Sequence, residues 1–61
     1  MKTYKLTIFE KSGEKLLDQL FKAASDKAAK EHGQQLIQAH AGEEKTYRCT
    51  SSDGRLLLFH I

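Results

Sequence analysis

The architecture of this 61-residue chain depends on residues 14–24, whose sequence is EKLLDQLFKAA. The apolar residues recur at helical spacing, yet Leu17 and Phe21 also fall on one face of a strand. Gly13 favours a hairpin turn just before the stretch, because glycine adopts a positive φ at little cost. Ser25 and Asp26, directly after it, are a helix-start signal, and either can act as the N-cap. We therefore predict that this stretch is the second strand of a hairpin, with a helix as the alternative interpretation.

The sequence on either side predicts the remaining elements. Residues 2–10 alternate apolar and polar side chains, as a half-buried strand does. Residues 26–40 are rich in alanine, lysine and glutamine and predict a helix. Two β-rich segments, residues 45–50 and 55–61, flank an Asp-Gly turn signal. We expect an α+β fold of order β-β-α-β-β, in which one helix packs on one face of a four-stranded antiparallel sheet.

The turn residue Gly54 sets the expected register of the last hairpin. With Gly54 as a bulge residue, Cys49 opposes Leu57 and Tyr47 opposes Phe59 on the helix side of the sheet. Alternate side chains of a strand point to opposite faces. The residues of this strand expected on the other face are Leu56, Leu58 and His60.

Gly33 lies inside the predicted helix, where glycine costs about 1 kcal/mol relative to alanine. One interpretation is that the helix approaches the sheet very closely at this residue. The alternative is a tolerated imperfection.

Composition limits the class of protein. Sixty-one residues supply only one core, so residues 1–61 are expected to form a single domain. The net charge of +2 is too small for a dedicated nucleic-acid binder. The single cysteine, Cys49, cannot close an internal disulfide, and the first residues lack the apolar segment of a secretory signal. We therefore expect a cytoplasmic protein that does not enter a membrane.

The sequence offers few residues at the spacing that a catalytic or metal-binding site needs. Cys49 is expected to face the core while His60 points away, which separates a nucleophile from its base. His32 and His40 are eight residues apart, too far round the helix to bind one metal. No phosphate-binding glycine loop is present in the sequence. We expect a protein that is not an enzyme and uses no cofactor, metal or small-molecule substrate.

The face of the sheet away from the helix is the main functional candidate. Phe9, Leu56 and Leu58 are expected there, and clustered exposed apolar residues usually mark an interface. The predicted occupant is a second copy of the chain, giving a homodimer, or another protein. The alternative is that these are scattered apolar residues, which most protein surfaces carry.

A second hypothesis uses the same face. If Lys5, Arg48 and Phe9 lie together, they could neutralise and stack on a single-stranded nucleic acid, as some open sheets do. The sequence has no continuous aromatic motif of that kind. Weak single-stranded nucleic-acid binding is therefore the alternative to protein association.

Two segments of the chain resemble the YhzD-like family of small bacterial proteins. They are residues 20–30, LFKAASDKAAK, and residues 45–60, KTYRCTSSDGRLLLFH. The resemblance extends over essentially the whole chain, including its length. Members of this family occur in spore-forming bacteria and have no established function. The resemblance implies a bacterial cytoplasmic protein and transfers no active-site residue.

Overall fold

The computed structural model describes residues 1–40, 42 and 44–61. Its elements follow the predicted order β-β-α-β-β and confirm the α+β fold. The elements are β1 (Lys2–Phe9), β2 (Lys15–Ala23), α1 (Asp26–Ala39), β3 (Thr46–Ser51) and β4 (Leu56–His60). Among the described residues, no helix has the length and apolar character needed to cross a membrane.

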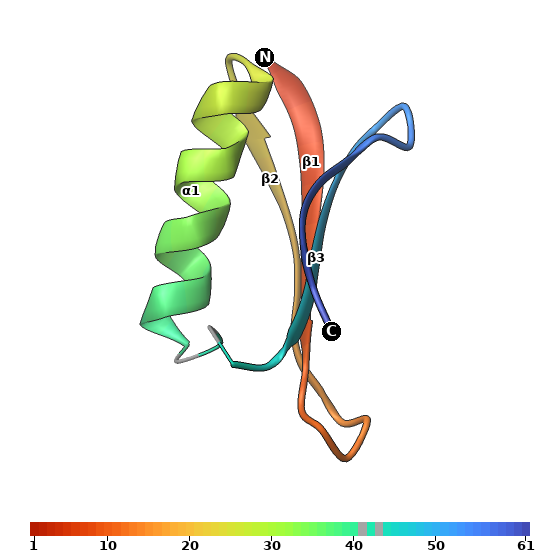
Figure 1. The fold of residues 1–61 in the computed structure, drawn as a ribbon. Coiled ribbons are helices and arrows are strands. Elements are labelled where there is room, and N and C mark those ends of the chain that lie inside the picture. Colours follow the sequence, from red (N-terminus) through yellow and green to blue (C-terminus); the bar gives the residue numbers. More distant parts are fainter. Residues whose placement is uncertain (41, 43) are drawn as a thin grey trace.

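The four strands form one antiparallel sheet with the order β2-β1-β3-β4. Strands β1 and β3 are therefore central, and β2 and β4 are the edges. Helix α1 lies along one face of the sheet, and no other described element covers the opposite face (Figure 1). We call this opposite side the uncovered face.

Residues 14–24, for which the sequence allowed either a strand or a helix, contain strand β2. Tyr4 pairs with Phe21 and Ile8 pairs with Leu17, so these four side chains face the helix together. Gly13 has a φ of 95° in the preceding turn, a conformation that glycine adopts without strain. Tertiary pairing with β1 therefore overrides the helical spacing of the leucines.

Helix α1 begins at the predicted cap. The Ser25 hydroxyl accepts a hydrogen bond from the backbone N–H of Ala28 at 3.2 Å. On the buried side of the helix, a Cβ placed on Gly33 would lie 3.1 Å from Cδ1 of Leu58 and 3.6 Å from Sγ of Cys49. The close approach expected at Gly33 is thus confirmed, because a side chain there would crowd the sheet.

The predicted register of the last hairpin is wrong beyond its first pair. Gly54 has the expected positive φ of 89°, and Thr50 pairs with Leu56. A β-bulge then leaves Leu57 unpaired, so Cys49 opposes Leu58. This shift by one residue moves Leu58 beneath the helix and places Phe59 on the uncovered face.

Candidate functional site: the uncovered face

The strand pairing defines the side chains of the uncovered face. Residues that pair across an antiparallel ladder point to the same side of the sheet, and alternate residues share a face. The uncovered face comprises Thr3, Lys5, Thr7 and Phe9 of β1, Lys15, Asp18, Leu20 and Lys22 of β2, Thr46, Arg48 and Thr50 of β3, and Leu56 and Phe59 of β4.

The structure places two of the three predicted interface anchors on the uncovered face and the third on the helix side of the sheet. Phe9 and Leu56 lie on the uncovered face, and Leu56 is 51% exposed. Leu58 does not lie there, because it packs against the buried core under α1. The bulge at Leu57 causes this difference. Leu58 is therefore a residue of the core boundary, not of an exposed surface.

Two exposed apolar residues of this face were missed by sequence reasoning. Leu20 pairs with Lys5 and is 67% exposed, and Phe59 pairs with Arg48 and is 52% exposed. The position of Leu20 was available from the alternation of β2, since Phe21 faces the helix. The position of Phe59 was hidden because Leu56, Leu57, Leu58 and Phe59 are all apolar and give no periodic signal.

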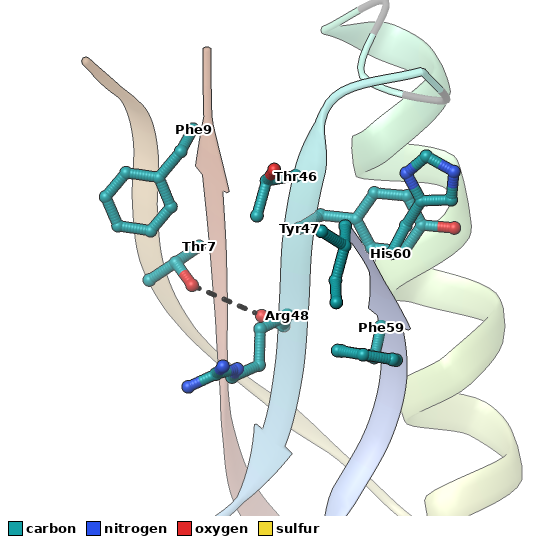
Figure 2. Close-up of a pocket in the computed structure, with 8 residues that line it drawn as sticks. Thr7, Phe9, Thr46, Tyr47, Arg48, Phe59 and His60 are labelled. Carbon is teal, nitrogen blue, oxygen red and sulfur yellow. Dashed lines mark hydrogen bonds between the residues drawn. The ribbon is translucent and has the colours of Figure 1, made fainter. Parts of the chain in front are cut away.

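A shallow hollow of about 200 Å³ opens on the uncovered face beside the end of β4. In Figure 2, Phe9 and Phe59 lie on opposite sides of β3, and the Arg48 side chain extends toward β1 between them. The hydroxyl of Thr7 donates a hydrogen bond to the backbone carbonyl of Arg48 at 3.4 Å. The hollow is lined by Thr7 and Phe9 of β1, Thr46, Tyr47 and Arg48 of β3, and Phe59, His60 and Ile61.

The rim of the hollow on the helix side is a stacked pair of rings. The rings of Tyr47 and His60 have centroids 5.6 Å apart and are inclined by 17°. Nδ1 of His60 lies 2.9 Å from the backbone carbonyl oxygen of Lys45 and donates to it. These contacts fix the end of β4 against β3, so one wall of the hollow is preformed.

Among the described residues of this face, some charged side chains form ion pairs and Arg48 does not. Asp18 forms ion pairs with Lys15 at 3.0 Å and Lys5 at 3.6 Å. The hydrogen bond from Lys15 holds the pKa of the Asp18 carboxyl below its usual range. Within the described part of the chain, Arg48 has no acidic partner. The three residues of the nucleic-acid hypothesis share this face, with Lys5 engaged and Arg48 available to a ligand.

The candidate nucleophile is poorly suited to chemistry. Cys49 is fully buried, and burial raises the pKa of its thiol. A thiol with a raised pKa forms little of the reactive thiolate at neutral pH. His60, which now shares the helix side with Cys49, stacks on Tyr47 instead. Among the described residues, no three His, Cys, Asp or Glu side chains gather as metal ligands would.

A second polar cluster joins three elements at the N-terminal end of α1. Asp26 accepts a hydrogen bond from the Tyr4 hydroxyl at 2.8 Å and forms an ion pair with Arg55 at 2.6 Å. Arg55 also pairs with Asp53 at 3.2 Å, and Asp53 accepts from the Ser51 hydroxyl. The charges of this cluster are mutually satisfied. Its groups tie the β3–β4 turn to α1 and β1, which indicates a structural role.

The fold and the surface define a small α+β protein whose single helix leaves one face of a four-stranded sheet open. A family model described as YhzD-like protein matches residues 1–61, and the chain belongs to this family. It is similar to the uncharacterised protein YhzD of Bacillus subtilis (strain 168), with 38% identity over 60 residues and 98% of each chain covered. No solved structure matches the chain.

Proposed function

We propose that the protein is a non-enzymatic self-association module, and that its partner is a second copy of the same chain bound along β4. The observation that carries this proposal is the composition of β4, an open edge strand with the sequence LLLFH. Natural edge strands are protected by charged residues, by proline, by bulges or by being short. Strand β4 is short and has a bulge at Leu57, but it contains no lysine, arginine, carboxylate or proline, so its outer backbone donors and acceptors can pair with another strand.

The opposite edge strand provides the contrast within the same molecule. Strand β2 carries Lys15, Asp18 and Lys22, which discourage pairing with another sheet. Strand β4 also pairs with a second β4 without bringing like charges together, because its five residues contain no lysine, arginine or carboxylate. A symmetric contact uses the same surface on both copies, and this requirement is met by an uncharged antiparallel edge.

The side chains of the uncovered face favour the same arrangement. A two-fold axis perpendicular to the sheet keeps each face continuous across the junction. Leu56 and Phe59 of one copy then lie beside Phe59 and Leu56 of the other. Both residues are about half exposed in the single chain, so the junction removes apolar surface from water. The product is an eight-stranded sheet with both helices on one side.

The test is the solution mass measured by sedimentation across a range of protein concentrations. We expect a reversible dimer for the wild type, and a shift toward monomer for Phe59→Lys and Leu56→Lys, because each variant would place a charge against an apolar side chain of the second copy. Both residues are exposed in the single chain, so the variants keep the fold. A wild-type protein that stays monomeric up to about 1 mM overturns the proposal, since it has no useful affinity for itself.

Leu20→Lys is the matched control for the position of the contact. It makes the same chemical change on the same face, but on edge strand β2, and Leu20 is even more exposed than Leu56. We expect this variant to dimerise like the wild type. Loss of the dimer in Leu20→Lys would show that the sheets associate face to face, and the β4 arrangement would be abandoned.

A further inference from the structure

We propose that the hollow between Phe9 and Phe59 is a binding site for a nucleotide, with the base against the two phenyl rings and the phosphate on Arg48. This site goes beyond self-association, because pairing along the β4 edge would cover only the Leu56 and Phe59 margin of the uncovered face and would leave Phe9 and Arg48 open. Its residues come from β1, β3 and β4, so the sheet itself holds the rings and the charge in place.

The size and the walls of the hollow suit one flat ring. Its volume of about 200 Å³ is below that of ordinary drug-sized pockets, which begin near 300 Å³, and it opens on the surface. Phe9 and Phe59 stand on either side of β3 (Figure 2). Phe59 is half exposed, which leaves a ring surface for stacking. Aromatic side chains on an open sheet bind bases because every base has a flat face.

The charge of the hollow selects an anion. None of its lining residues is acidic, and Arg48 is the one lysine or arginine among them. Asp18, the carboxylate of this face among the described residues, forms ion pairs with Lys15 and Lys5. The planar guanidinium of arginine matches the oxygens of a phosphate and also stacks on rings. An arginine that has no acidic partner in the described part of the chain, and that lies beside aromatic rings, is thus complementary to a molecule that carries a base and a phosphate together.

The same chemistry occurs in a free mononucleotide and in a single-stranded nucleic acid. The two sources differ in how they use the rest of the face. A strand would continue past Arg48 and meet Lys5 or Lys22, and its binding would fall steeply with salt. A mononucleotide would engage Arg48 alone and depend weakly on salt.

The experiment is a titration of the ¹⁵N-labelled wild-type protein followed by amide chemical shifts. The probes are adenosine 5′-monophosphate, adenosine, inorganic phosphate, a hexaglutamate peptide and an oligodeoxyadenylate of about eight nucleotides. We expect the monophosphate or the oligonucleotide to shift the amides of Thr7, Thr46, Arg48 and Phe59. A monophosphate as effective as the oligonucleotide identifies the free nucleotide. Tighter, salt-sensitive binding of the oligonucleotide identifies the strand.

Three variants examine the parts of the site. Arg48→Gln should weaken nucleotide binding about tenfold by removing a charge-assisted contact, and Phe9→Leu should weaken it about tenfold by removing a stacking surface. Lys22→Gln is the control, because it removes one positive charge from the same face outside the hollow. It should leave monophosphate binding unchanged.

Several results would overturn the proposal. These are the absence of shifts with every probe, equal binding of adenosine or hexaglutamate, and equal weakening by Arg48→Gln and Lys22→Gln. Arg48 and Phe9 lie on the central strands, so these variants leave the β4 edge intact. The solution mass of the same samples therefore reports on self-association separately, and either proposal can fail without the other.

Discussion

At the scale of single residues, Asp26 connects helix α1 to β1 through Tyr4 and to the β3–β4 turn through Arg55. The hydrogen bond from Tyr4 is the main cause that lowers the pKa of the Asp26 carboxyl, and the charge of Arg55 adds to it. Burial is the main cause that raises the pKa of Tyr4, and the hydrogen bond to Asp26 acts in the same direction. The contacts of this cluster therefore stabilise the ionised form of Asp26 and the neutral form of Tyr4.

This lowered pKa predicts how stability depends on acid. Below the ordinary value of 3.8, the unfolded chain takes up a proton at Asp26 before the folded chain does. The contribution of Asp26 is thus present above that pH and is lost as the pH falls through the lower folded pKa. Urea unfolding between about pH 7 and pH 2 should show stability falling at the acid end. Asp26→Asn should flatten that fall.

Tyr4→Phe provides the companion variant, because it removes the main cause of the lowered pKa and keeps the ring in the core. It should also reduce the acid dependence, by less than Asp26→Asn, since Arg55 still faces the carboxylate at 2.6 Å. An acid dependence equal to that of the wild type in both variants would contradict a stabilising role of this contact.

At the scale of elements, the contact between α1 and the β3–β4 hairpin depends on Gly33. A Cβ at Gly33 would lie only 3.1 Å from Cδ1 of Leu58, which is closer than usual, and at an ordinary contact distance of 3.6 Å from Sγ of Cys49. The glycine carries a helix-propensity cost of about 1 kcal/mol. That cost is offset by the close packing of the helix on the sheet, which covers the buried thiol and one side of β4.

Gly33→Val tests this contact. The branched side chain must displace Leu58 or lift the helix, and overpacking of this kind typically costs 1–3 kcal/mol, so we expect a loss of about 2 kcal/mol in the free energy of unfolding. Gln34→Val places the same residue on the exposed side of the same helix and should change stability by only a few tenths of a kcal/mol. A Gly33→Val variant as stable as the wild type would show that the gain in helix propensity offsets any crowding, and would contradict the packing role of the glycine.

The elements also show what the sequence could predict. Alternation in β1 and the cap at Ser25 were sufficient for the strands, the helix and the open face. The sequence could not predict which side chains of β4 point to each face of the sheet. Leu56, Leu57 and Leu58 are identical, so no pattern reveals a bulge among them. The observed site therefore differs from the predicted one, because Leu58 lies under the helix and Phe59 lies beside Arg48. Only the pairing of β4 with β3 in the structure shows which face of the sheet each of these leucines belongs to.

At the scale of the whole molecule, the single chain is about as compact as other folded monomers of its mass. Its accessible surface of 4109 Å² is close to the roughly 4,000 Å² expected for a folded monomer of 6.9 kDa. A domain of this length buries only about 60% of the surface of its unfolded chain, which leaves little reserve of stability. Further burial must therefore come from a contact between molecules, and β4 offers the edge for it.

Such a contact makes stability depend on protein concentration. If only the folded chain dimerises along β4, mass action favours the folded state as concentration rises. Above the dissociation constant, a hundredfold rise should add about 1.4 kcal/mol per chain to the free energy of unfolding, measured by urea titration. Phe59→Lys should abolish this dependence, and Leu20→Lys should keep it. A wild-type midpoint that is constant over that range would mean that the folded chain is equally stable alone, and that β4 gains nothing from a second copy.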